Sequence, residues 1–210
     1  MRLGSKICIQ SPDKSYPALL DDKGRIDLQA NATCPGATTT DVGAILDSPQ
    51  NPLNPQIRLV TLTVGGADLN FSDVLTTCTL DATACTGAVD DALSLLPDLK
   101  SDLTNLYTEI AAAAPEARIV VTGYPLLFEP PPSEFSADVI NAVNNGGVAL
   151  NKTIEAAVAE ANEDGNIDYV DVTEEFQKHG VLLRVNNPDD PDDPNASFIA
   201  PSSSATPPPT

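Results

Sequence analysis

Histidine and basic side chains are scarce in this sequence. It has one histidine, His179, and its cysteines form no Cys-x-x-Cys pair. Zinc sites and redox pairs need such clusters, so we expect no metal site, and no part of the sequence indicates a cofactor. Eleven basic residues against 30 acidic ones give a formal charge of −19, which repels phosphate backbones and anionic lipid surfaces. Nucleic acid is therefore not an expected partner, and the charge is typical of a soluble secreted protein or one adapted to salt.

Long apolar runs are also missing. No stretch approaches the roughly 18 to 20 consecutive apolar residues of a membrane-spanning helix, so we expect no membrane span. Residues 1–10, MRLGSKICIQ, include basic residues but lack the apolar segment of a secretory signal. The sequence therefore predicts no signal peptide in this chain.

The cysteines form an even set, and Cys78 and Cys85 are close enough in sequence to close a short loop. We favour disulfides over free thiols, without a fixed connectivity, for Cys8, Cys34, Cys78 and Cys85. Disulfides indicate an oxidising compartment. Because this secreted chemistry comes without a secretion signal, we expect that the start of the protein is missing.

A length of 210 residues with 41% apolar content predicts one domain with a hydrophobic core, expected to be monomeric. We place this domain at residues 1–185. Residues 186–210 consist largely of Pro, Asp, Asn and Ser, with almost nothing to bury, and are expected to be disordered.

Four segments have the composition of strands: Ile26 to Ala30, Ile57 to Val64, Arg118 to Thr122 and Ile167 to Val172. Helical spacing of apolar residues covers Leu93 to Ile110, and Pro97 is expected to break that stretch and open a second helical segment. A further helix is predicted over residues 136–163, weakened in its middle by Gly146 and Gly147. A short helix is predicted around Tyr16 to Leu20.

Strands that alternate with helices favour a parallel sheet, because each parallel connection needs a crossover. The predicted fold is a three-layer α/β/α sandwich. In such a sheet, ligands bind at the carboxyl ends of the strands, so the loops after the strands are the candidate site. Gly65 and Gly66 in the second loop allow a close ligand approach, or they simply turn the chain.

Several loop segments resemble successive segments of secreted SGNH/GDSL ester hydrolases in order and spacing. These are SYPALL from Ser15, ATCPGATT from Ala32, VTLTVGGADLNFSDVLTTC from Val60, ARIVVTGYPLLF from Ala117 and VDVTEEFQKHGV from Val170. The resemblance implies a serine esterase or lipase with a flavodoxin-like sheet, an extracellular location, and a small acyl-ester or glycan-ester ligand. In that family a Gly-Asp-Ser serine attacks the acyl carbon, an Asp-x-x-His pair supplies the base, and a Gly amide and an Asn side chain hold the oxyanion.

Carried over by position, the family's oxyanion glycine matches Gly36, and its Asn matches Ala67, whose methyl group donates no hydrogen bond. Asp68 retains the acidic neighbour of that Asn, with a structural hydrogen-bonding role expected rather than a catalytic one. Asn70 lies three residues beyond the matching position and is a weaker candidate donor. The expected cleft residues are Gly36, Gly65, Gly66, Ala67, Asp68 and Asn70.

The nucleophile and the base have no counterpart in this sequence. Ser5 and Ser11 lack a preceding Gly-Asp, and Ile199 stands where the resemblance places the catalytic histidine. His179 lies upstream of that place and is interpreted as a surface or loop residue. We expect no catalytic residue in this chain and possible loss of the family's first strand, which residues 6–10 could replace only with strain.

Two hypotheses follow. In the first, the sequence is a fragment of a secreted esterase or lipase and is catalytically incomplete. In the second, the chain is a non-catalytic relative that uses the cleft to bind an acyl or glycan ligand. The missing motifs at both ends favour the first hypothesis, whereas Ala67 favours the second.

Overall fold

The computed structural model describes residues 2–3, 6–8, 15–24, 26–128 and 135–177. In chain order they form β1 (Arg2–Leu3), β2 (Lys6–Ile7), α1 (Tyr16–Asp22), α2 (Thr39–Leu46), β3 (Leu59–Leu62), α3 (Phe71–Leu80), α4 (Ala82–Leu93), α5 (Leu96–Ala113), β4 (Arg118–Thr122), α6 (Ala137–Ala161) and β5 (Ile167–Val170). The predicted tail from residue 186 lies outside the described residues.

The main sheet has three parallel strands in the order β3-β4-β5. The segment Arg118–Thr122 has its predicted bounds, while β3 and β5 are shorter than predicted. The predicted strand from Ile26 to Ala30 is wrong, because the structure has no strand there. Instead of pairing with a strand, the Leu28 amide of this segment donates a hydrogen bond to the Asp21 carboxylate at 3.0 Å.

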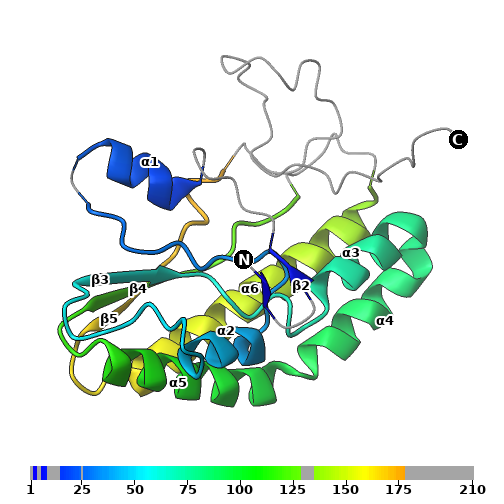
Figure 1. Ribbon diagram of the computed structural model, residues 1–210. Coiled ribbons are helices and arrows are strands. Elements are labelled where there is room, and N and C mark those ends of the chain that lie inside the picture. Colours follow the sequence, from blue (N-terminus) through cyan, green and yellow to red (C-terminus); the bar gives the residue numbers. More distant parts are fainter. Residues whose placement is uncertain (1, 4–5, 9–14, 25, 129–134, 178–210) are drawn as a thin grey trace, which may run out of the picture.

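The strand register sorts the side chains onto two faces. Val60, Ile119 and Ile167 are paired neighbours, and Ile119 and Ile167 are fully buried. Below them, α5 and α6 pack against one another and supply the apolar side chains of the core (Figure 1). α1 lies over the opposite face, and its Tyr16 hydroxyl bonds to the Thr61 hydroxyl at 2.5 Å. These layers confirm the predicted α/β sandwich.

The sequence predicted a helix break at Pro97 and a weak point at Gly146 and Gly147, and the structure has only the first. Pro97 lies in the first turn of α5, where its missing N–H group leaves no bond unmade, so the predicted break before it is confirmed. In contrast, α6 is continuous through Gly146 and Gly147, and the predicted weak point is wrong. Both glycines are buried, and a Cβ would make only ordinary contacts, at 3.5 Å from Val89 of α4 for Gly146 and 3.7 Å from Leu126 for Gly147.

α4 was not expected from the periodicity, and neither were α2 and α3. α2 begins with a capping box in which Thr38 and Asp41 exchange side-chain-to-backbone bonds. α3 follows directly from the β3 loop through Asn70. Both helices are short, with little apolar periodicity for a pattern to detect.

All four cysteines are paired, which confirms the expectation of disulfides. Cys8 bonds to Cys34 and Cys78 bonds to Cys85, with S–S distances of 2.05 and 2.02 Å. β2, next to Cys8, pairs with β1 in a separate antiparallel sheet. Lys6 and Ile7 therefore do not enter the main sheet, and Ile9 and Gln10 of the same segment lie outside the described residues.

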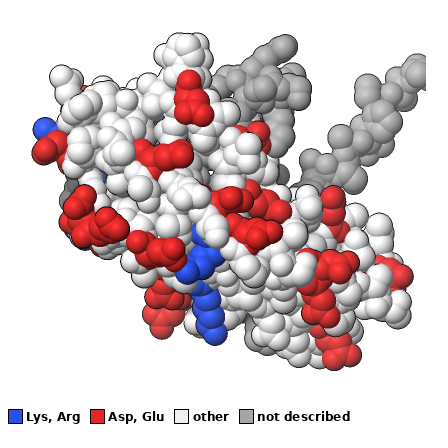
Figure 2. All heavy atoms as spheres, turned by 90° about the horizontal axis from the view of Figure 1, so that it is seen from below, with Lys and Arg blue, Asp and Glu red and all other residues white. Residues whose placement is uncertain are grey.

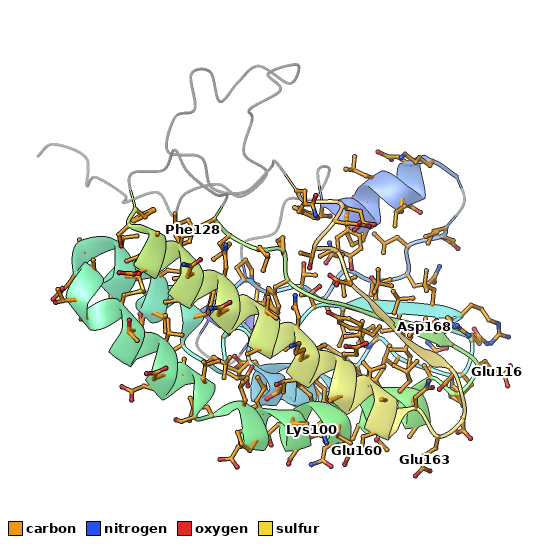
Figure 3. The ribbon with its side chains drawn as sticks, turned by 180° about the vertical axis from the view of Figure 1, so that it is seen from behind. Lys100, Glu116, Phe128, Glu160, Glu163 and Asp168 are labelled. Atoms are coloured by element: carbon orange, nitrogen blue, oxygen red, sulfur yellow. A yellow bond between two sulfur atoms is a disulfide. The ribbon has the colours of Figure 1, made fainter. Side chains whose placement is uncertain are left out.

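Acidic side chains dominate the helical surface. Figure 2 shows them spread over the face seen from below, with few basic groups between them. Two basic residues pair across neighbouring elements. Lys100 of α5 bonds to Glu160 of α6 at 2.5 Å (Figure 3), and Arg118 pairs with Asp168 on the neighbouring strand. In the described ranges no helix is both long and apolar enough to cross a membrane.

Candidate functional site

The loops after β3 and β4 are adjacent, because these strands are parallel neighbours. The β3 loop turns sharply. Gly65 has φ of 121°, which side-chain-bearing residues rarely adopt, and Asn70 has φ of 51°. A hydrogen bond of 3.1 Å from the Asn70 amide to the Ala67 carbonyl brings these two residues to the ends of one turn.

Asp68 ties this loop to α2. Its carboxylate accepts bonds from the Thr39 amide at 3.0 and 3.2 Å and from the Thr39 hydroxyl at 2.6 Å. The carboxylate thus satisfies a free amide in the first turn of α2, where the helix dipole also favours a negative charge. Asp68 therefore fixes the position of a helix.

Gly36 lies three residues before Thr39, in the loop that leads into α2. A bond of 3.0 Å from the Ala37 amide to the Cys34 carbonyl closes a turn in which Gly36 has φ of 73°. The Cys8–Cys34 disulfide holds the same turn. Gly36 and the β3 loop are thus both anchored at the start of α2, through Cys34 and Asp68.

A shallow cavity of about 290 Å³ opens beside this anchor. It is lined by Thr38, Thr40, Ala67, Asp68, Asn70, Leu95, Asp98, Leu99 and Asp102. Of the expected cleft residues, the structure brings Ala67, Asp68 and Asn70 to this wall, whereas Gly36, Gly65 and Gly66 do not line it. Asn70 makes no side-chain cap on α3. In the described residues no cluster of His, Cys, Asp or Glu is placed to hold a metal.

A series of hydrogen bonds, called here the relay, connects Asn151 of α6 through Tyr124 to Gly66 in the β3 loop. The Asn151 side chain accepts from the Tyr124 amide and donates to the Tyr124 carbonyl, both at 2.8 Å. The Tyr124 hydroxyl in turn accepts from the Gly66 amide at 3.1 Å. Burial raises the pKa of Tyr124, so its hydroxyl remains neutral. The relay fixes the β4 loop on α6 and the β3 loop on Tyr124.

Sequence reasoning missed Asn151, although a signal for it exists. It lies on the apolar face of α6, four residues after Gly147 and three before Ile154. Asn144, one heptad earlier, makes the same pair of bonds to the Phe128 backbone, at 3.2 and 2.8 Å. A polar residue that recurs on an apolar stripe indicates a buried hydrogen-bond partner.

Tyr107 lies in the same interior and gives a stability prediction. It is fully buried, and its hydroxyl has no hydrogen-bond partner among the described residues. Burial, helped by the charge of Asp68, raises the pKa of Tyr107. We expect Tyr107→Phe to raise the free energy of unfolding by about 1 kcal/mol, because an unsatisfied buried hydroxyl is removed.

The matched control is Tyr124→Phe, which removes a hydroxyl that does accept a bond and should lower stability by about 1 kcal/mol. Urea unfolding of both variants measures the difference. A loss of stability in Tyr107→Phe equal to that in Tyr124→Phe would show that the Tyr107 hydroxyl is bonded in solution.

Comparisons of sequence and of structure both match this chain to lipases. Residues 6–197 match the GDSL-like Lipase/Acylhydrolase family. The chain is 33% identical over 175 residues to a lipase of Streptomyces rimosus, covering 79% of this chain and 61% of that protein. The chain thus spans less than two thirds of this curated relative.

Two solved structures resemble the fold. Phospholipase A1 from Streptomyces albidoflavus NA297 superposes with a TM-score of 0.69 and 31% identity over 80% of this chain and 71% of that one. The extracellular lipase of Streptomyces rimosus gives a TM-score of 0.65 and 31% identity over 81% of this chain and 72% of that one. Because the family match spans nearly all of the sequence, the chain belongs to the GDSL-like lipase/acylhydrolase family.

Proposed function

We propose that this chain derives from a secreted carboxylic-ester hydrolase, an esterase or lipase, and that residues 1–210 by themselves do not hydrolyse esters. Family membership and the named lipase relatives support the reaction class. Both disulfides and the extracellular lipase relative support secretion. A small acyl ester is the proposed ligand, and we propose a monomer.

Ala67 is the observation on which the second half of the proposal depends. By the sequence resemblance, Ala67 takes the position of the family's Asn, and it lies on the wall of the cavity beside Asp68. A methyl group cannot donate a hydrogen bond to a developing oxyanion. Loss of one such donor typically lowers kcat by roughly 100- to 1,000-fold.

The remaining groups are proposed to be absent as well. Ser5, Ser11, His179 and Ile199, on which the expectations for nucleophile and base fell, all lie outside the described residues. The proposal for them rests on sequence: no Gly-Asp precedes either serine, and isoleucine accepts no proton. If the chain is a piece of a longer protein, the rest of that protein would supply the nucleophile and the base.

A second candidate function is non-catalytic binding of an acyl or glycan ligand in the same cleft. Ala67 favours it, because this substitution lies well within the matched region. The DNA upstream of Met1 separates the two candidates. An in-frame Gly-Asp-Ser segment after a signal peptide would favour the enzyme, and an immediate stop codon would favour the binding protein.

Purified residues 1–210 should show no turnover of p-nitrophenyl acetate or butyrate above the buffer rate. Ala67→Asn should not restore turnover, because it returns one donor without a nucleophile or a base. Initial rates measured across substrate concentrations, with the Streptomyces rimosus lipase as a positive control, decide the matter. Saturable hydrolysis that disappears when a single serine is replaced would show that the proposal is wrong.

A further inference from the structure

Leu80 is the most exposed large hydrophobic side chain among the described residues, with 83% of its surface accessible. It is the last residue of α3, and Asp81 is the N-cap of α4, so Leu80 lies at the tip of the α3–α4 hairpin. This hairpin forms the end of the molecule away from β3, β4 and β5 (Figure 1). A leucine in such a place contributes nothing to the core.

The tip that carries Leu80 is held rigid. The Cys78–Cys85 disulfide bridges α3 and α4 on either side of it, and both cysteines are buried where the two helices pack. The Asp81 carboxylate accepts bonds from the Thr83 and Ala84 amides at 2.9 and 3.3 Å and so caps α4. Leu80 is thus presented to solvent by a fixed backbone, and turning it inward would break these contacts.

An uncharged groove of about 500 Å³ adjoins Leu80. Its lining residues are Cys78, Thr79, Leu80, Ala82, Phe135, Ser136 and Val139. None of them carries a charge, although the chain as a whole has a formal charge of −19. In a protein so acidic, an uncharged groove beside a protruding leucine matches a partner that carries no net charge and accepts an aliphatic side chain.

Asp81 disfavours a partner that carries negative charge. It is exposed at the tip, and its bonds to Thr83 lower its pKa, so it remains ionised. An anionic surface would be repelled by Asp81 and by the net charge of the chain, whereas a zwitterionic surface would not. A lipid surface also accepts an aliphatic side chain without a shaped pocket, and the groove beside Leu80 could hold an acyl chain.

We propose that the α3–α4 tip, with Leu80 inserted, docks this chain onto the surface of zwitterionic or uncharged lipid. This inference rests on the proposed derivation of the chain from an esterase or lipase and adds a surface for the lipid that such an enzyme acts on. The ten residues of α3 span roughly 15 Å, so the cavity at Ala67 and Asn70 lies one helix length from Leu80. Docking at the tip therefore leaves the candidate site about one helix length from the lipid surface.

The test is co-sedimentation of the purified chain with phosphatidylcholine vesicles. Leu80→Glu should lower the partition coefficient by at least about tenfold, because it places a charge where the wild-type leucine would be buried in lipid. Val148→Glu is the matched control: Val148 is also exposed, to 37%, but lies on α6 away from the tip, and this variant should bind like the wild type. Phosphatidylglycerol vesicles should bind the wild-type chain more weakly than phosphatidylcholine vesicles.

Equal binding of wild type and Leu80→Glu, stronger binding to phosphatidylglycerol, or no binding of the wild type to phosphatidylcholine would each overturn the docking surface. Leu80→Ala, expected to lose part of the binding without adding a charge, separates loss of apolar contact from new repulsion. Turnover of soluble short-chain esters does not depend on docking. Failure of this inference would therefore leave the proposed function standing, and failure of that function would appear in the turnover assay.

Discussion

Asn151→Leu is expected to lower the free energy of unfolding by about 3 to 4 kcal/mol. Asn151 is 8% exposed and makes both of its 2.8 Å bonds to the backbone of Tyr124. Leucine has the same branching and number of side-chain heavy atoms but leaves the Tyr124 amide and carbonyl without partners, and each unsatisfied buried group costs about 1 to 3 kcal/mol. Urea unfolding followed by circular dichroism measures the loss.

Asn144→Leu provides the matched control on the same helix face. Asn144 makes equivalent bonds to Phe128 but is only half-buried, so water can partly replace it. We expect a loss of about 1 to 2 kcal/mol. A loss below about 1 kcal/mol in Asn151→Leu, or losses of equal size in both variants, would contradict the importance given to the burial of Asn151.

Removal of the Cys8–Cys34 disulfide should have the second large effect. This disulfide joins residues 26 apart and, on the chain-entropy view, should contribute about 3.5 kcal/mol by restricting the unfolded chain. The double variant Cys8→Ser, Cys34→Ser should therefore unfold at a clearly lower urea concentration. It should also loosen the Cys34–Ala37 turn that contains Gly36, which amide hydrogen exchange would report.

The double variant Cys78→Ser, Cys85→Ser is the comparison. Its disulfide spans only seven residues, so the same relation gives about 2.5 kcal/mol, and its turn is far from Gly36. We expect faster amide exchange around Gly36 in the first variant alone. Faster exchange at Gly36 in both variants would mean that neither disulfide acts locally.

The central part of the fold could be predicted from sequence because its elements are defined by local chemistry. Arg118–Thr122 is rich in β-branched residues and forms a strand with the predicted bounds, and Pro97 opens α5 as expected. The segment Ile26–Ala30 alternates apolar and polar residues, but among the described residues it pairs with no strand. Strand formation there depends on tertiary partners that composition does not specify.

At Gly146 and Gly147 the prediction failed in the other direction, because it expected a weak point where the structure has a continuous helix. Glycine weakens an isolated helix, but both glycines are buried here, and the packing of α6 against α4 and α5 outweighs the propensity. The relay from Asn151 through Tyr124 to Gly66 was likewise beyond sequence reasoning, because it joins three segments far apart in the chain. Only the position of Asn151 on an apolar stripe hinted at it.

For the candidate site, the resemblance correctly indicated the family, and the structure brings Ala67, Asp68 and Asn70 to one cavity. The bonds from Asp68 to Thr39 show what that carboxylate does: it holds the start of α2. The absence of a nucleophile and a base remains a prediction, since the residues on which it falls lie outside the described ranges.

A fluorophosphonate probe, which reacts covalently only with an activated serine, tests most directly whether residues 1–210 retain the family's fold without its catalytic groups. Intact-mass spectrometry of the folded chain after incubation should show no adduct beyond that found with the urea-unfolded chain. One adduct per folded chain, on a single serine and lost when that serine is replaced by alanine, would contradict the proposal.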